Sequence, residues 1–324
     1  MPKVSVIIPV YNASMFLEKC CNSLFSQTLD DMEFIFVDDC STDNSVQVIQ
    51  ELLDLYPKRS EQVKVVRLSQ NKGVSAARQR GLDESEGEFV IHCDADDWVD
   101  IHMYKEMYEA AITQNAEVVI SDYMTCYPNS SDNKLIQYPD EFVGNPSFCI
   151  SPYEGAVWNK LISKNLIDLY KITFTAGIMV GEDFLFVTKC RLHACREVVI
   201  HKPYYQYCQN NTTSITRVYT KQKIDTVVIL AQLMDEYISA VGMKDKYLYR
   251  INYLKFQAKQ FFLLYEEIRD IKHWQSLFPE IGNDYKQMPV AKYVKTCVWL
   301  IQHKMTSVAS LILRFKDIYL KLKN

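Results

Sequence analysis

Cysteine is plentiful in this 324-residue chain, but the spacings that give cysteine a metal or redox role are missing. Ten cysteines occur without a C-x-x-C pair and without a Cys/His cluster at zinc spacing, which argues against a zinc module. We therefore expect reduced and mostly buried thiols, as in a cytoplasmic protein, and no disulfide framework.

Long apolar runs and a dinucleotide-binding turn are missing as well. No stretch reaches the roughly 18 apolar residues of a membrane span, and no signal peptide is recognised before the first apolar run at Val4. A G-x-G-x-x-G turn is absent, which disfavours a dinucleotide-dependent oxidoreductase. We expect a cytoplasmic protein that does not span a membrane.

Charge is unevenly distributed along the chain. The formal net charge is −4, but residues 286–324 carry eight Lys or Arg against Asp317, a charge of +7, which leaves −11 for residues 1–285. An acidic body argues against nucleic acid as the main ligand. A basic tail suits an anionic membrane surface.

Strand and helix patterns alternate over the first hundred residues. Apolar runs predict strands, and residues with helical spacing lie between them; the predicted strands are 4–9, 34–37, 63–68 and 88–92. This alternation predicts an α/β fold with a mostly parallel sheet, helices on both faces, and ligands at the carboxyl ends of the strands. Residues 127–146 are polar and predict a loop or hairpin over the site, and residues 220–275 predict helices.

Pairs of carboxylates follow two of these strands. Asp94 and Asp96 lie in the run Cys-Asp-Ala-Asp-Asp-Trp at 93–98, and their i, i+2 spacing at a strand end points both to one side. Together they can hold one hard divalent cation, which can in turn bind a diphosphate. Asp38 and Asp39 end the second strand; they can accept hydrogen bonds from a nucleobase or ribose, or stabilise the start of the next helix.

These motifs, together with the segments 4–12 and 37–43, resemble a family 2 glycosyltransferase with the GT-A fold of nucleotide-diphospho-sugar transferases. The resemblance covers residues 1–215. It implies a catalytic domain at 1–218, with a nucleotide-binding half at 1–100 and an acceptor half at 101–218. A helical C-terminal region with a basic amphipathic helix would occupy 219–324.

The resemblance also implies which residues bind the donor. Asp96 would be the main ligand of Mn²⁺ or Mg²⁺, and Asp94 would contact the metal or the ribose. Asp39 would read uracil. The remaining donor-binding candidates come from the strand ends and from the family's N-x-G-x-x-x-A-R segment; they are Pro9, Val10, Tyr11, Asp38, Asn71, Gly73 and Arg78. Two roles stay open for Arg78, direct contact with the donor or bracing of the site through Asp94 or Asp39.

A Gly-Glu-Asp motif at 181–183 supplies the catalytic candidates. Direct displacement at a sugar's anomeric carbon needs a base to take the acceptor's hydroxyl proton. The resemblance assigns this role to Asp183 and orientation of the acceptor to Glu182, whereas a purely structural interpretation makes both of them first-turn acids of a helix. Weaker acceptor candidates are Trp98, Trp158 and Lys160, and the Ser214-Ile215 pair resembles one near the diphosphate.

The last segment has apolar residues in steps of three and four from 294 to 322, which predicts one long amphipathic helix. Three partners fit this stripe: the catalytic domain, a second copy of the chain in a homodimer, or a membrane surface contacted by residues 286–324. The Q-x-x-R-W segment and membrane helices of polymerising synthases are absent, which favours transfer of one sugar per encounter.

The sequence therefore predicts an inverting glycosyltransferase of the hexose-transferring kind. Its donor would be a nucleotide sugar, a UDP-sugar above all, and its acceptor a glycan or lipid-linked glycan in cell-surface polysaccharide synthesis. It would be cytoplasmic or peripheral on the inner face of the cell membrane. The alternatives are a catalytically silent nucleotide-sugar-binding scaffold and a nucleotidyltransferase; the latter would need a Gly-rich basic loop where residues 11–14 stand.

Overall fold

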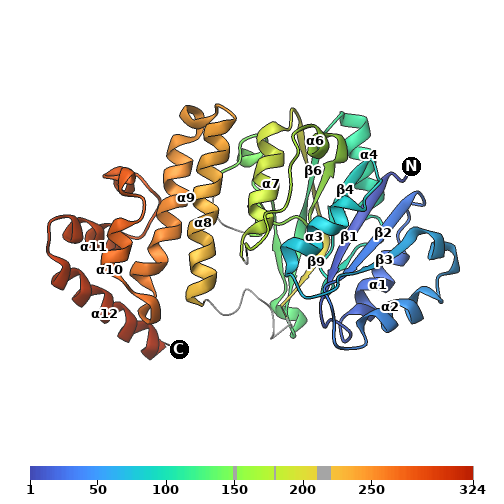
Figure 1. Ribbon diagram of the computed structural model, residues 1–324, viewed down its shortest axis with the longest axis horizontal. Coiled ribbons are helices and arrows are strands. Elements are labelled where there is room, and N and C mark those ends of the chain that lie inside the picture. The colour runs from blue at the N-terminus through green and yellow to red at the C-terminus, as the bar shows by residue number, and fades with distance from the viewer. Residues whose placement is uncertain (149–151, 179, 210–219, 324) are drawn as a thin grey trace. The chain divides into compact units, whose positions relative to one another are not determined.

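The computed structural model of the protein describes residues 1–148, 152–178, 180–209 and 220–323 (Figure 1). The chain divides into two compact units: the first comprises 1–147 and 151–218, and the second comprises 148–150 and 219–324. Phe148, from within the expected catalytic domain, thus belongs with the second unit.

One mixed sheet forms the centre of the first unit. Its strands are β1 (Val4–Val10), β2 (Met32–Asp38), β3 (Val63–Arg67), β4 (Phe89–His92), β5 (Trp98–Val99), β6 (Val118–Cys126), β7 (Lys134–Ile136), β8 (Lys160–Ser163) and β9 (Glu197–Cys208). Their order is β3-β2-β1-β4-β8-β6-β9-β5, with β7 paired to β6. The pairs among β1 to β4 are parallel, whereas β8 runs antiparallel to both β4 and β6.

The strand register brings two of the predicted motifs to one edge of the sheet. Val10, the last residue of β1, lies opposite Asp38 of β2, and Ile7 lies opposite His92, the last residue of β4. The carboxylate-rich turns after β2 and β4 therefore leave the sheet at the same edge, which is where parallel α/β sheets bind ligands.

Helices cover both faces of this sheet (Figure 1). They are α1 (Leu17–Phe25), α2 (Ser45–Leu53), α3 (Val74–Asp83), α4 (Met103–Gln114), α5 (Pro152–Gly155), α6 (Lys164–Leu169) and α7 (Glu182–His193). Alternate residues of β1 point to opposite sides: Val4 and Ile8 pack in the cluster that holds α1 and α4, and Ile7 packs in the cluster of α6 and α7. The expected α/β class, with helices on both faces of the sheet, is confirmed.

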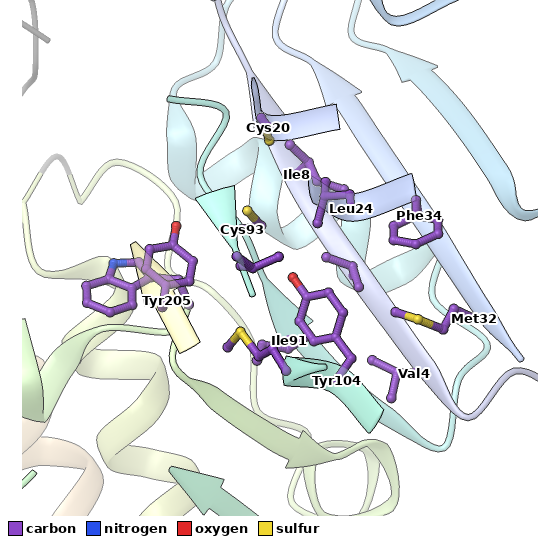
Figure 2. Packing of buried hydrophobic residues seen from close by; sticks show 14 of the residues in the cluster. Val4, Ile8, Cys20, Leu24, Met32, Phe34, Ile91, Cys93, Tyr104 and Tyr205 are labelled. Carbon is purple, nitrogen blue, oxygen red and sulfur yellow. The ribbon is translucent and has the colours of Figure 1, made fainter. Parts of the chain in front are cut away.

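Figure 2 shows the first of these clusters. Ile8 of β1 lies beside Leu24 of α1, and Val4 of β1 lies beside Met32 of β2; all four are buried. Full burial of one such side chain contributes about 1.5–3 kcal/mol to stability. Cys20 also lies in this core. Every cysteine that the structure describes is a free thiol and most are buried, as expected.

The polar segment that was expected to be a loop or hairpin forms a hairpin. β7 pairs antiparallel with β6 through residues 123–125 and 134–136. Two short 3₁₀ turns, Ser130–Asp132 and Asp140–Phe142, lie on either side of β7. The backbone N–H of Tyr138 donates to Asp122 Oδ1 (2.8 Å), which holds the segment after β7 to β6.

The second unit is helical. Its helices are α8 (Lys221–Ala240), α9 (Lys244–Leu264), α10 (Ile271–Ser276), α11 (Lys292–Gln302) and α12 (Thr306–Lys323). The prediction of one long terminal helix is wrong, because the chain turns at Lys304, which adopts a left-handed φ of 63°. Among the helices that the structure describes, none combines the length and hydrophobicity needed to cross a bilayer.

Candidate active site

The turn after β4 presents the predicted metal-binding carboxylates. Asp94 and Asp96 are partly exposed, whereas the next residue, Asp97, is buried. The hydroxyl of Tyr205 donates to Asp97 Oδ2 (2.6 Å) and accepts from the backbone N–H of Asp94 (3.0 Å). The N–H of Cys208 donates to Asp97 Oδ1 (2.7 Å). Strand β9 therefore holds the turn in shape and leaves Asp94 and Asp96 accessible.

Arg78 connects this turn to the Gly-Glu-Asp motif. Its buried guanidinium donates through Nη2 to Asp94 Oδ1 (2.8 Å) and through Nη1 to Glu182 Oε1. Arg78 lies one turn into α3, Asp94 follows β4, and Glu182 is the first residue of α7. The ion pair with Asp94 is the contact that the bracing role of Arg78 predicts.

The two acids that begin α7 differ in exposure. Glu182 is buried, and burial followed by the charge of Asp183 raises its pKa to about 7, against the opposing effect of Arg78. Asp183 is only half-buried. Burial raises the pKa of Asp183, and the positive charge of Arg78 limits the rise. Asp183 Oδ1 accepts the backbone N–H of Phe184 (2.7 Å). Asp183 is thus the acid of this pair that a substrate could reach, whereas Glu182 is held by Arg78.

The aspartates after β2 organise the loops around them. Asp39 is buried, and its two carboxylate oxygens accept the backbone N–H groups of Lys72 and Gly73, each at 2.7 Å. Asp38 has no exposed surface; its Oδ1 accepts from the N–H of Ser41 (3.0 Å), and Arg67 Nε lies 3.1 Å from its Oδ2. The Asp38 carboxylate therefore serves the turn after β2 and has no surface for direct contact with a nucleotide.

The other donor candidates line the same edge of the sheet. Asn71 and Gly73 are exposed just before α3, and Gly73 has a φ of 85°, a conformation that L side chains rarely adopt. Tyr11 is half exposed at the end of β1, Pro9 is partly exposed, and Val10 is buried. Backbone N–H groups of 72 and 73 point at Asp39, so this carboxylate rather than a phosphate occupies them.

The three weak acceptor candidates lie in different environments. Trp98 is partly exposed, and Lys19 Nζ lies 3.0 Å from the centre of its ring. Trp158 is buried and stacks on Tyr205, with ring centres 4.3 Å apart, so it supports the strand that holds the turn after β4. Lys160 has no exposed surface, which does not fit a direct contact with an acceptor.

Lys160 belongs to a buried polar layer beneath the site. Its Nζ donates to the carbonyl of Ala156 and to Asn159 Oδ1, both at 2.9 Å. Burial and the nearby charge of Arg191 lower the pKa of Lys160 to about 7. Arg191 itself is paired with two buried glutamates, Glu154 and Glu197, at 2.8 Å. An unpaired buried charge is costly, so this layer depends on all of its partners.

The carboxylate oxygens at this edge of the sheet are suitable ligands for a hard cation. Among the described residues, no group of three or more His, Cys, Asp or Glu side chains is arranged to hold a metal ion. Asp94 and Asp96 nonetheless both offer partly exposed carboxylates in the turn after β4, with Asp94 partly engaged by Arg78. Oxygen ligands from one or two carboxylates, completed by phosphate oxygens and water, are the usual environment of Mg²⁺ bound with a phosphorylated substrate.

Comparison with known families identifies the chain. The model of glycosyl transferase family 2 matches residues 5–170, which is half of the sequence. The chain belongs to glycosyl transferase family 2. The matched range contains the turns after β2 and β4, α3 with Arg78, and the buried Lys160.

Several relatives of this glycosyltransferase are known. The "Putative glycosyltransferase EpsH" of Bacillus subtilis is 24% identical over 87% of this chain and 82% of its own length. A "Cholesterol galactosyltransferase" of Borreliella burgdorferi is 30% identical over 63% of this chain and 59% of its own. A "Poly(ribitol-phosphate) beta-glucosyltransferase" of Bacillus spizizenii is 27% identical over 63% of this chain and 32% of its own.

Solved structures show the same fold. The crystal structure of residues 1–349 of TarS from S. aureus matches 97% of this glycosyltransferase and 91% of that chain, with a TM-score of 0.70 and 20% identity. The same fragment in complex with UDP-GlcNAc matches 88% of this chain and 92% of its own (TM-score 0.61, 20% identity). A mannosyltransferase from Pyrobaculum calidifontis, in complex with GDP-Man and Mn²⁺, matches 99% and 88% (TM-score 0.54, 15% identity).

Sequence reasoning missed one residue that organises the site of this family 2 glycosyltransferase. Tyr205 bonds to both Asp94 and Asp97, but it lies more than a hundred residues from them, in a tyrosine-rich strand without a recognisable motif. The Ser214-Ile215 pair lies outside the described residues.

Proposed function

We propose that this enzyme is an inverting glycosyltransferase that moves a hexose from a nucleotide-diphosphate donor to a glycan or lipid-linked acceptor. The observation that carries the proposal is Arg78, which holds Asp94 of the metal-binding turn and Glu182 of the Gly-Glu-Asp motif in one buried cluster. Asp183, the neighbour of Glu182, keeps exposed surface. The carboxylates for the leaving diphosphate and the base for the attacking hydroxyl thus belong to one connected site.

The donor occupies the carboxyl edge of β1, β2 and β4 in this proposal. The backbone around Pro9, Val10 and Tyr11 lines the base. Asp39, which unlike Asp38 keeps a small exposed surface (3%), accepts from the uracil imide with the lone pairs that Lys72 and Gly73 leave free. Asn71 and Gly73 border the same site. We favour a UDP-sugar, and the UDP and UDP-GlcNAc complexes of the structurally similar TarS support that choice.

Asp94 and Asp96 would hold Mn²⁺ or Mg²⁺, and the Mn²⁺ complex of the structurally similar mannosyltransferase supports a divalent ion. A bound divalent cation supplies positive charge for the diphosphate as it leaves. Arg78 fixes the orientation of Asp94 by the 2.8 Å ion pair, and Tyr205 fixes its backbone N–H.

Asp183 is the general base of the proposed reaction. It takes the proton of the acceptor hydroxyl while that oxygen forms a bond to the anomeric carbon. The bond from the anomeric carbon to the diphosphate oxygen breaks, and the nucleoside diphosphate leaves with the electron pair. One displacement inverts the configuration, and no second carboxylate is placed as a nucleophile among the described residues of this site. Glu182 acts indirectly, because Arg78 engages its carboxylate.

The acceptor side is open to the widest range of partners. Trp98 is partly exposed and is our candidate for contact with an acceptor sugar, whereas Trp158 and Lys160 are buried and would act from beneath the site. A relative named for transfer to poly(ribitol-phosphate) supports a role in cell-surface polymers. We place the enzyme in the cytoplasm or on the inner face of the cell membrane, with residues 286–324 at the membrane surface.

The test is a calorimetric titration of the protein with UDP, with and without Mn²⁺, and with GDP for comparison. Metal-dependent binding of UDP supports the proposal. Metal-dependent binding of GDP alone would keep the mechanism and overturn the choice of base. If neither nucleotide binds, and UDP-sugars give no transfer to any acceptor, the proposed enzyme is wrong and a silent scaffold becomes the better description.

A further inference from the structure

The outer surface of α12 is apolar and exposed. We define the outer face of α12 as six of its exposed apolar residues, which are Val308, Leu311, Phe315, Ile318, Tyr319 and Leu322. Leu320 is also exposed, but at 100° per residue it lies off this stripe. Their steps of three and four place them in one stripe along the helix. Phe315 is 64% exposed and Leu322 is 82% exposed. Soluble proteins seldom leave a continuous apolar stripe of this kind uncovered.

This face is not needed to hold the helix in place. The opposite face of α12 supplies that packing, since Ala309 and Leu313 have no exposed surface. Asp317 is turned inward and pairs with Arg269 (2.7 Å), and Lys316 donates to the carbonyl of Leu264 (2.8 Å). The second unit thus fixes α12 through one face and presents the other.

Positive charge borders the outer face. At 100° per residue, Arg314 and Lys321 fall on one flank of the stripe and Lys316 on the other. Arg314 makes no ion pair in the part of the chain that the structure describes, whereas Lys321 pairs with Glu266 (2.6 Å) and Lys316 pairs with Asp317 (3.1 Å). The only acid within α12, Asp317, points away from this surface.

These charges distinguish among partners for the outer face. In a symmetric dimer the same patch meets itself, so two copies of each flanking cation would come close together. An anionic bilayer offers the opposite charge at its surface and an apolar interior just beneath it, which matches a stripe of apolar residues with basic flanks.

We propose that the outer face of α12 docks on an anionic lipid bilayer, with Phe315 and Leu322 in the acyl boundary and Arg314 at the headgroups. This docking deepens the proposed function, because it names the surface by which residues 286–324 would bring the site to a lipid-linked acceptor. It also commits to a peripheral contact by one helix face, without insertion of the chain across the bilayer.

The experiment is sedimentation of the full chain with vesicles of phosphatidylcholine mixed with phosphatidylglycerol, and with vesicles of phosphatidylcholine alone. The protein should bind the anionic vesicles more strongly. Phe315→Gln should weaken that binding by about ten-fold, as expected for loss of one large buried apolar group. Arg314→Gln should weaken it by about five-fold, and only on the anionic vesicles.

Two matched variants serve as controls. Leu55→Gln removes a leucine that is 70% exposed outside this face, and Lys58→Gln removes an exposed lysine from the same part of the chain; neither should change vesicle binding. Equal binding of Phe315→Gln and Leu55→Gln would overturn the proposal. So would a dimer in solution that Phe315→Gln dissociates in the absence of any vesicle binding.

Calorimetry with UDP separates this proposal from the proposed function. Phe315→Gln should bind UDP as the unaltered protein does, because the substitution changes only an exposed side chain of the second unit. Vesicle binding without nucleotide binding would support the docking face and contradict the proposed function. Nucleotide binding without vesicle binding would support the proposed function and contradict the docking face.

Discussion

Arg78 and Asp94 form an ion pair of 2.8 Å between a guanidinium that is almost fully buried and a carboxylate that keeps about a quarter of its surface. The same guanidinium binds Glu182, and the charges of Asp94 and Glu182 offset the burial of Arg78 and hold its pKa above the usual value. One cation thus joins two motifs that are 88 residues apart in the sequence.

Replacing Arg78 should destabilise the fold as well as the site. Arg78→Met leaves Glu182 buried without its partner, and breaking a buried pair in this way costs about 3–5 kcal/mol. Urea unfolding of Arg78→Met measures the loss. The double variant Arg78→Met, Glu182→Gln should lose less stability than Arg78→Met alone, since no buried charge is then left unpaired. Equal losses in the two variants would mean that the ion pair is unimportant.

Asp183 should be required for transfer and not for donor binding. Asp183→Asn removes the proton acceptor while keeping the shape of the side chain, and general-base catalysis contributes about 10²- to 10⁴-fold to rate. We expect the transfer rate to fall by that factor while calorimetry gives unchanged UDP binding. Asp54→Asn changes an exposed aspartate elsewhere and should leave both measurements as they are. A normal transfer rate in Asp183→Asn would exclude Asp183 as the base.

Substitution of the adjacent aspartates Asp96 and Asp97 should affect different properties of the protein. Asp96→Asn should abolish the Mn²⁺ dependence of UDP binding and leave the melting temperature unchanged, because Asp96 is partly exposed. Asp97→Asn should lower the melting temperature, because the buried Asp97 accepts from both Tyr205 and Cys208 and an amide cannot accept with both of its terminal atoms. Similar behaviour of the two variants would contradict this division of roles.

A histidine should make stability depend on pH. His201 lies between Asp140 (3.1 Å) and Asp122 (3.2 Å), and hydrogen bonding first to Asp140 and then to Asp122 raises its pKa. A raised pKa favours the folded state in its protonated form. The contribution is therefore complete below the ordinary histidine pKa of about 6.5 and is lost as the pH rises through the raised value.

The measurement for His201 is the urea midpoint of the unaltered protein and of His201→Gln at several pH values across that window. The difference between the two midpoints should shrink as the pH rises. A difference that stays constant or grows would show that His201 does not titrate in contact with these carboxylates. Because its side chain is partly exposed, the effect should also diminish in high salt.

Much of this architecture could be predicted from local sequence, and the reasons are physical. Apolar runs and helical spacings specify β1 to β4 and the helices between them, since each pattern depends on residues close in the chain. The parallel arrangement then places Asp39 and Asp94 at one edge of the sheet. Glu182 and Asp183 lie in the first turn of α7, as the helical interpretation of the Gly-Glu-Asp motif predicted.

What could not be predicted depends on contacts between distant residues. Tyr205 meets Asp97 across 108 residues, and no local pattern reports such a meeting. Lys160 is buried because Ala156 and Asn159 satisfy its ammonium group, although a lysine in isolation is expected at the surface. Neither Gly nor Pro lies at the break around Lys304, so the local sequence gives no signal for it. Lys304 adopts a left-handed backbone conformation just after α11 ends.

Phe148 shows that the two units are not two successive segments of the chain. This phenylalanine is fully buried, its ring lies 5.2 Å from that of Tyr247 in α9, and it belongs to the helical unit although it precedes the Gly-Glu-Asp motif by more than thirty residues. A single cut near residue 219 would therefore strip Phe148 of its packing partner. We therefore expect a shortened protein that lacks the helices of the second unit to expose apolar surface and to aggregate.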